Sequence, residues 1–319
     1  MRNMQQYAMT KTAFLFPGQG SQKPGMGADL YERFPSARAR FDEANDVLGF
    51  SLTDIMFSEA KEAAEQLKKT EITQPALYVH SLATMAVLDE MGFAPSMAAG
   101  HSLGEYSALA ACGALSFVDG LRAVRRRGEL MAQAGVVRPG AMAAVLGLDA
   151  DVLEQICADA SEEGDVAVPA NYNAPGQIVI SGDRGAVERA SEAAKESGAR
   201  RVLPLPVSGA FHSPLMEYAV EGLSEALEAL EITSPRCPVY LNVTAEPTTD
   251  PAELRQRLLD QLTSPVRWAQ SLEQMKANGA VRFVEVGSGN VLSGLVKRTL
   301  GREVVTTPAG TADELENIS

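Results

Sequence analysis

Short runs of hydrophobic residues alternate along the chain with longer segments whose charged residues recur at helical spacing. Residues 12–16 are apolar and end at Pro17-Gly18, as in a buried strand that leads into a loop. A long, mostly apolar helix is predicted at 74–91, because Gly92 and Pro95 follow it. This alternation predicts an α/β fold with a parallel sheet. The further expected elements are strands at 96–101 and 281–286, helices at 28–48, 58–69, 103–111, 216–231 and 251–262, and a last helix that Gly287-Ser288-Gly289 opens.

A second pattern occupies residues 138–206. Its elements are predicted in the order strand, helix, strand, strand, helix, strand, which matches the ferredoxin-like split motif. We therefore expect a ferredoxin-like subdomain at 138–206, inserted into a large domain made of residues 11–137 and 207–310. The first ten residues are expected to form an extension ahead of that domain. The strands of the subdomain are expected at 141–148, 166–173, 177–182 and 201–206, and its helices at 150–163 and 184–198.

Composition and charge exclude several classes of function. The 319 residues include 28 basic and 41 acidic side chains, and the resulting net charge of −13 would repel nucleic acid phosphates. The three cysteines are too scattered for a disulfide framework or a metal cluster, so we expect no metal. No apolar stretch is long enough for a signal peptide or a membrane span. We therefore expect a cytoplasmic protein that binds neither membranes nor nucleic acid.

Residues 100–104, Gly-His-Ser-Leu-Gly, follow a predicted strand and precede a predicted helix. This arrangement is typical of the nucleophile elbow, a strained turn that lifts a serine hydroxyl clear of the sheet. Backbone passes close to both sides of Ser102, so glycine is needed at positions 100 and 104. The Leu103 N–H lies at a helix N-terminus, where a developing oxyanion is stabilised. An ordinary Gly/Ser-rich turn is the alternative, but the flanking strand and helix favour Ser102 as the nucleophile of an acyl-transfer enzyme.

A serine nucleophile needs a general base, and the chain has only three histidines. His80 lies in the middle of a predicted helix, where a packing or surface role is expected. His101 adjoins Ser102 in an extended segment, so the two side chains should point to opposite faces. His212 lies in a Gly- and Pro-bounded loop after a strand and is therefore the predicted base. No acid between serine and histidine is marked by its context, which favours something other than a carboxylate as the support of His212.

Several segments together resemble a known family. The chain contains, in this order, FPGQGSQ at 16–22, GHSLGEY at 100–106, NYNAPGQ at 171–177, GAFHS at 209–213 and EVG at 285–287. Each motif alone is weak, but the combination is highly specific. Over about residues 12–305 the chain resembles the malonyl-CoA:acyl carrier protein transacylases of type II fatty acid synthesis.

The resemblance supports the predicted nucleophile and base and implies further site residues. It implies that the backbone N–H groups of Gln19 and Leu103 form the oxyanion hole. It also implies that the main-chain carbonyl of Gln261 orients the histidine, which would explain the missing acid. Asn173 matches an asparagine near the active site, on the inserted subdomain.

Substrate recognition is expected to involve an arginine and a phenylalanine. Arginines occupy positions 125–127, at the end of the next predicted helix, and the residues alone do not select among them. The resemblance, through the pair Arg127-Gly128, implies that Arg127 grips the malonyl carboxylate, which a guanidinium fork can hold by two charge-assisted bonds. In related polyketide enzymes, malonyl selectors tend to read Ala-Phe-His, as at 210–212, and Phe211 leaves less room for an α-methyl branch. One methyl group is worth only about 1–3 kcal/mol in a pocket, so some leakage is expected.

The resemblance implies an acyltransferase that moves the malonyl group from malonyl-CoA to the phosphopantetheine thiol of acyl carrier protein. The reaction would pass through a malonyl-serine, need no cofactor, and supply fatty acid chain elongation. We expect a monomer with an α/β-hydrolase-like core. A serine hydrolase on the same core is one alternative, which the arginine and the missing acid disfavour. An acyltransferase of a polyketide pathway is a second alternative. A non-catalytic carrier-binding protein is a third, disfavoured by the intact Ser102 and His212.

Overall fold

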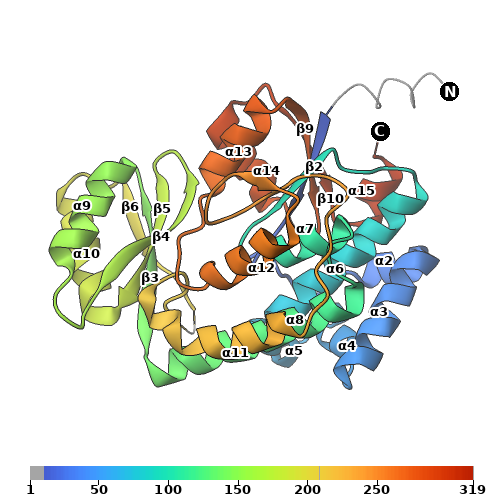
Figure 1. The fold of residues 1–319 in the computed structure, drawn as a ribbon, viewed down its shortest axis with the longest axis horizontal. Helices are drawn as coiled ribbons and strands as arrows, with labels where there is room; N and C mark the ends of the chain where they lie inside the picture. The colour runs from blue at the N-terminus through green and yellow to red at the C-terminus, as the bar shows by residue number, and fades with distance from the viewer. Residues whose placement is uncertain (1–10, 208, 319) are drawn as a thin grey trace.

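A six-stranded sheet forms the centre of the larger part of the molecule, in the order β10-β9-β1-β2-β7-β8 (Figure 1). The computed structural model describes residues 11–207 and 209–318, so the extension expected at 1–10 lies outside it. Neighbours from β10 to β7 run parallel and only the edge pair β7–β8 is antiparallel, as the predicted α/β class requires. The strands are β1 Lys11–Phe16, β2 Met97–Gly100, β7 Val239–Tyr240, β8 Pro247–Thr248, β9 Ala280–Val286 and β10 Val305–Ala309.

Strand β1 contributes to two cores, one on each face of this sheet. Phe14 and Phe16 pack in the larger cluster, which includes the buried faces of α6 and α8. Ala13 and Leu15 pack in a second cluster with α13 and α14. Both faces are therefore covered, which explains why residues 13–16 of β1 form an uninterrupted apolar run. The helices of this part are α2 Ala28–Arg33, α3 Pro35–Leu48, α4 Leu52–Phe57, α5 Lys61–Leu67, α6 Thr70–Glu90, α7 Gly104–Ala111, α8 Phe117–Val137, α11 Glu217–Glu228, α12 Pro251–Asp260, α13 Trp268–Ala277, α14 Val291–Leu300 and α15 Ala312–Glu316.

The helix expected at 28–48 is interrupted. Phe34 adopts an extended conformation, with φ −123° and ψ 113°, and it separates α2 from α3. Pro35 then occupies the first turn of α3, where its missing N–H costs nothing, and it disfavours helical geometry in the residue before it. The expected single helix is therefore wrong at this proline.

Helix α8 corrects the placement of the arginines. It runs to Val137, so Arg127 lies in the middle of a long helix rather than at the end of one. The helix expected after Gly287 is α14, but α15 follows it and is the last described helix. The short elements α4, β7, β8 and β10 were not expected. Helix α13 was missed as well, although its ten residues include Trp268, Leu272 and Met275, which are buried at helical spacing. Strands of two residues, such as β7, are too short to show periodicity.

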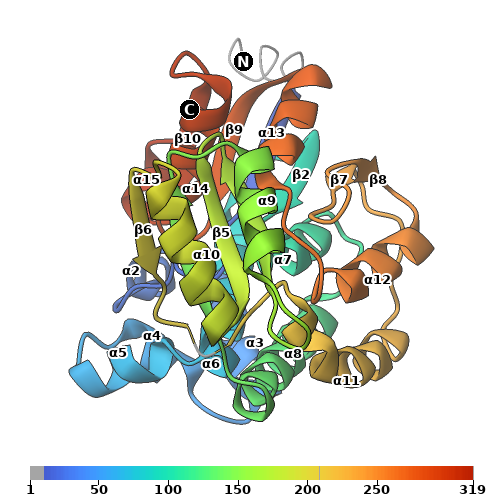
Figure 2. The same ribbon diagram turned by 90° about the vertical axis from the view of Figure 1, so that its left-hand side faces the viewer.

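The segment predicted as a subdomain forms a second, antiparallel sheet in the order β4-β5-β3-β6. Figure 1 shows it as a lobe on the left, and Figure 2 shows α9 and α10 together on its outer face. Ile178 and Ile180 of β5 pack against these helices, whereas Val179 between them faces the large part. The elements are β3 Gly140–Leu146, α9 Ala150–Ala160, β4 Ala167–Ala174, β5 Gln177–Asp183, α10 Arg184–Glu196 and β6 Arg201–Pro204.

The small sheet is joined to the larger part of the molecule by backbone hydrogen bonds as well as by the connecting chain. The Tyr172 N–H donates to the Val266 carbonyl at 2.8 Å, and the Val266 N–H donates to the Ala170 carbonyl at 2.9 Å. These bonds fix β4 beside the segment that precedes α13. Within the described residues, no helix is both long and apolar enough to cross a membrane.

Candidate active site

The turn between β2 and α7 has the geometry of the predicted nucleophile elbow. Ser102 has φ 51°, in the left-handed region that non-glycine residues rarely adopt. A Cβ at Gly100 would lie 1.8 Å from the Gly104 carbonyl, and one at Gly104 would lie 2.0 Å from the Phe16 carbonyl. Both glycines are therefore required by close backbone contacts. The strained serine is held by its own N–H, which donates to Asn242 Oδ1 at 2.7 Å.

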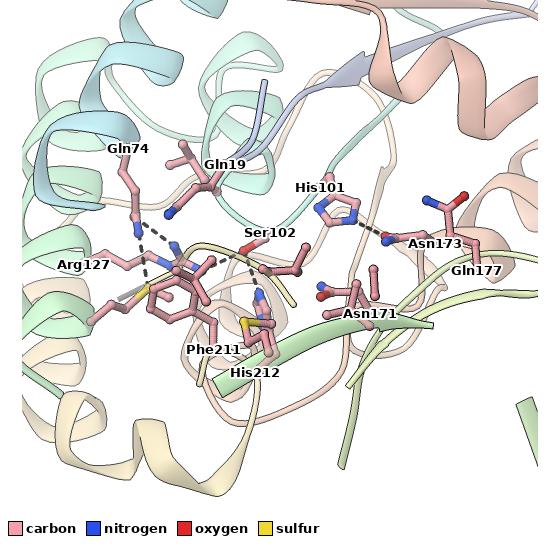
Figure 3. Close-up of a pocket in the computed structure, with 17 residues that line it drawn as sticks. Gln19, Gln74, His101, Ser102, Arg127, Asn171, Asn173, Gln177, Phe211 and His212 are labelled. Atoms are coloured by element: carbon pink, nitrogen blue, oxygen red, sulfur yellow. Dashed lines mark hydrogen bonds between the residues drawn. The ribbon is translucent and has the colours of Figure 1, made fainter. Parts of the chain in front are cut away.

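His212 lies against this serine, as Figure 3 shows. The Ser102 Oγ to His212 Nε2 distance is 2.8 Å, and His212 Nδ1 lies 2.8 Å from the Gln261 main-chain oxygen. A carbonyl only accepts, so Nδ1 carries the proton and Nε2 is free to accept from the hydroxyl. Gln261 directly follows α12, and a carbonyl at a helix C-terminus has no partner inside the helix. The carbonyl expected from the family resemblance thus lies where the missing acid would be.

The environment of His212 keeps its imidazole neutral. The side chain is almost fully buried, and this burial, together with the nearby positive charge of Arg127, lowers its pKa to about 3. The hydrogen bond to the Gln261 carbonyl opposes that shift. An unprotonated Nε2 is therefore available throughout the neutral pH range to take the serine proton.

The other two histidines have different surroundings. His80 is buried in the middle of α6, beside Gly27, and is a packing residue. His101 lines the pocket and donates from Nε2 to Asn173 Oδ1 at 2.7 Å. Its ring also packs against Trp268, with centroids 5.3 Å apart. His101 and Asn173 thus connect the elbow to the small sheet, and neither contacts the Ser102 hydroxyl.

Arg127 reaches the site from α8 although it is only 1% exposed. Its Nη2 donates to Ser102 Oγ at 3.1 Å and its Nη1 donates to Gln74 Oε1 at 2.9 Å (Figure 3). Its Nη2 also donates to Gln261 Oε1 at 2.8 Å. All three acceptors are neutral, and within the described chain the buried Nε has no hydrogen-bond partner. The Glu105 carboxyl interacts with this guanidinium electrostatically but does not accept a hydrogen bond from it. A buried guanidinium that is not hydrogen-bonded to a carboxylate is costly, so this position favours an anionic ligand.

The neighbouring arginines have other partners. Arg125 donates from Nη1 to the Glu71 carbonyl at 2.7 Å and from Nε to Glu129 Oε1 at 2.7 Å. The Glu71 carbonyl would normally bond to the N–H four residues later, but Pro75 at that position has none. Arg125 thus supplies the donor that the Glu71 carbonyl lacks within α6. Arg126 lies half exposed near Glu129. Only the third arginine of the run enters the pocket.

The pocket is a cavity of about 270 Å³ between the two sheets. Gln19 and Leu103 line it beside Ser102, and across the described residues neither of their N–H groups has a hydrogen-bond acceptor. Phe211 lines it next to the histidine, and Asn173 lines the opposite wall. All eight expected site residues therefore lie at this cavity or, for Gln261, directly behind it.

Sequence reasoning missed three polar residues that support the site. Gln74 and Asn242 hold Arg127 and the Ser102 N–H respectively, and Glu105 accepts from Asn242 N at 3.1 Å. Glu105 had a signal, because it lies in the first turn of the helix that follows the elbow. Gln74 and Asn242 had none, since each lies in a segment distant in sequence from the nucleophile. No group of metal-ligating side chains occurs in the part of the chain that the structure describes.

Comparison with known proteins agrees with this geometry. Residues 13–314 match the family model described as the acyl transferase domain. The malonyl CoA-acyl carrier protein transacylase of Bacillus subtilis (strain 168) is 48% identical over 97% of this chain and 96% of its own length. The protein of the same name from Staphylococcus aureus (strain MRSA252) is 42% identical over 97% and 98%.

Solved structures extend the likeness to the fold. An acyl carrier protein S-malonyltransferase from Vibrio cholerae superposes with a TM-score of 0.92 at 42% identity, covering 97% of this chain and 100% of that one. A malonyl-transacylase solved in complex with a type II PKS acyl-carrier protein gives 0.91 at 41% identity, covering 96% and 98%. This chain belongs to the acyl transferase domain family and, within it, to the malonyl CoA-acyl carrier protein transacylases.

Proposed function

We propose that this protein transfers the malonyl group from malonyl-CoA to the phosphopantetheine thiol of acyl carrier protein. The observation that carries the proposal is the buried Arg127 guanidinium, whose hydrogen-bond acceptors are all neutral and which lies 3.1 Å from the Ser102 hydroxyl. An acyl group that bears a carboxylate would supply the missing negative charge while its thioester carbon lies at the serine. The names of the homologues, which act as malonyl CoA-acyl carrier protein transacylases, support the same reaction.

The first half-reaction forms a malonyl-serine. His212 Nε2 takes the Ser102 proton as Oγ attacks the thioester carbonyl carbon, and the negative charge develops on the carbonyl oxygen. The unpaired N–H groups of Gln19 and Leu103 stabilise that oxyanion. The carbon–sulfur bond then breaks, and the coenzyme A sulfur leaves with the proton from His212.

The second half-reaction reverses these steps with a new thiol. His212 takes the proton of the phosphopantetheine thiol, whose sulfur attacks the malonyl-serine carbonyl. Collapse of the tetrahedral intermediate returns the proton to Ser102 and releases the malonyl-carrier. The Gln261 carbonyl holds the imidazole in one tautomer through both halves, so a carboxylate is not needed behind it.

Acyl selectivity depends on the apolar wall as well as on Arg127. Phe211 is buried beside His212 and lines the cavity. Its ring occupies space that an α-methyl branch would need, so the malonyl group is preferred over methylmalonyl. Asn173, through its bond to His101, holds the opposite wall in place.

The strand orders support a finer description of the fold. We infer an α/β-hydrolase-like large domain, at 11–137 and 207–310, and a ferredoxin-like subdomain at 138–206, because the second sheet is antiparallel with both helices on one face. Contacts of α15 support extending the large domain to residue 316, since the Ala312 N–H donates to Asp29 Oδ2 at 2.7 Å. We further propose a cytoplasmic protein that acts as a monomer, since one chain supplies all eight expected site residues.

Intact-mass measurement after mixing with malonyl-CoA tests the function. The wild-type protein should gain one malonyl group, Ser102→Ala should gain none, and addition of carrier protein should discharge the adduct onto the carrier. Discharge into water at the same rate without carrier would instead indicate a hydrolase. An active wild type without any adduct would rule out the covalent mechanism.

A polyketide carrier is a second candidate acceptor, because one similar structure is a complex with a type II PKS acyl-carrier protein. The chemistry at the serine would be unchanged. Comparison of kcat/KM for purified carriers of the two pathways distinguishes the candidates.

A further inference from the structure

Glu105 is a buried carboxyl group that forms no ion pair within the described residues, although it lies close enough to Arg127 to interact with it electrostatically. It lies in the first turn of α7, three residues after the nucleophile, and it is 0% exposed. Its Oε2 accepts from the Asn242 N–H at 3.1 Å and from Gln261 Nε2 at 2.8 Å. Its Oε1 has no hydrogen-bond partner among the residues described. Burying a carboxyl group in this way is costly, and the proposed mechanism does not use it.

The bond from Gln261 decides which way that side-chain amide faces. Its Nε2 is directed at Glu105 Oε2, with the Ser102 carbonyl at 3.1 Å and Asn242 Oδ1 at 3.4 Å as longer contacts. Its Oε1 therefore points the other way. A reversed amide would set its oxygen against the carboxyl oxygen and its N–H groups against the guanidinium, so it would lose both bonds.

The Gln261 oxygen in turn holds the guanidinium. Arg127 Nη2 donates to it at 2.8 Å, while Nη1 donates to Gln74 Oε1. Each of these two amide oxygens therefore holds one of the two terminal nitrogens of the guanidinium. A substrate carboxylate meets a guanidinium whose direction is already set, which is what bidentate binding needs.

We propose that Glu105 is a positioning residue for acyl selectivity, which acts by holding the Gln261 amide in the orientation that presents its oxygen to Arg127. The inference rests on the proposed function, in which Arg127 receives the acyl carboxylate. It assigns the Gln261 side chain to selectivity and its main-chain carbonyl to the base. Loss of Glu105 should consequently affect carboxylate-bearing acyl groups far more than neutral ones, because His212 keeps its support.

Two substitutions separate positioning from packing. Glu105→Met keeps the bulk but removes the acceptor, so it should lower the ratio of kcat/KM for malonyl-CoA to that for acetyl-CoA by about tenfold. Glu105→Gln can place its amide oxygen at the Oε2 position and should keep the ratio within about threefold of wild type. A purely structural role predicts equal losses for both acyl groups and no rescue by glutamine.

A double-mutant cycle with Gln261→Met tests whether Glu105 acts on Arg127 through the Gln261 side-chain amide. This variant keeps the main-chain carbonyl but lacks the amide, so Glu105→Met should change the acyl ratio no further in its background. An unreduced effect in that background, or equal malonyl and acetyl losses in the single variant, would overturn the proposal. If Glu105→Met fails to fold, retention of the wild-type ratio by Gln261→Met alone would overturn it equally. Failure of the wild type to take up malonyl would instead reject the underlying function.

Discussion

The two walls of the pocket are built differently. On the wall formed by the large sheet, Ser102 forms three hydrogen bonds, to Asn242, His212 and Arg127, each of 3.1 Å or less. On the wall formed by the small sheet, Asn173 contacts the nucleophile's neighbour His101 and not the reacting groups. The first wall holds strained and charged groups in one geometry, whereas the second closes the cavity over them. Chemistry and acyl recognition should therefore depend on the first wall, and substrate access on the second.

Among substitutions on the two walls, removal of the Arg127 guanidinium should cause the largest loss of activity with malonyl-CoA. Arg127→Ala should lower kcat/KM for malonyl-CoA by about 100-fold, because two charge-assisted hydrogen bonds are lost, and should affect acetyl-CoA much less. Arg125→Ala is the matched control from the same helix. It loses the bond to the Glu71 carbonyl and some stability but should leave the acyl ratio unchanged. Parallel kinetics with both thioesters measure this, and equal losses in Arg127→Ala would contradict the proposed carboxylate contact.

The same substitution should change the pH dependence. Arg127 is the second cause, after burial, of the low pKa of His212, so removal of its positive charge should raise that pKa. The acidic limb of the kcat/KM profile for acetyl-CoA should then move to higher pH. The expected shift is about one pH unit, which corresponds to a tenfold change in the proton dissociation constant of His212. Arg127→Lys keeps a positive charge and should leave the limb nearer its wild-type position. A limb that stays in place or moves to lower pH in Arg127→Ala would show that its charge does not act on the base.

The smallest effect is expected on the other wall. Asn173→Ala removes one neutral hydrogen bond to His101, which is worth about 1 kcal/mol, so activity should fall by roughly fivefold. The loss should be the same for malonyl-CoA and acetyl-CoA, because Asn173 does not touch the guanidinium. Steady-state kinetics with both thioesters would check it. A loss as large as that of Arg127→Ala would remove the distinction between the walls.

The short-range parts of the site could be predicted from the sequence because neighbouring residues enforce them. The elbow depends on Gly100 and Gly104, which lie two positions before and after Ser102. The order of the expected strands and helices at 138–206 likewise predicted the second sheet. The prediction of helix boundaries was wrong where a single residue interrupts the helix, as at Pro35. The choice among three arginines was equally beyond local pattern. Arg127 points inward because of its position on α8 and the packing of that helix against α6.

The sequence by itself determined a serine in a strained turn, one histidine available to activate it, and an α/β framework to carry both. Tertiary structure decided what holds them. Asn242 lies 140 residues from Ser102, and Gln261 lies 159 residues from it, yet both bond to its backbone. Such contacts depend on which strand ends and helix ends meet at one edge of the sheet. Hydrogen bonds act over about 3 Å, so the sequence names the donors and acceptors, but only the fold brings them together.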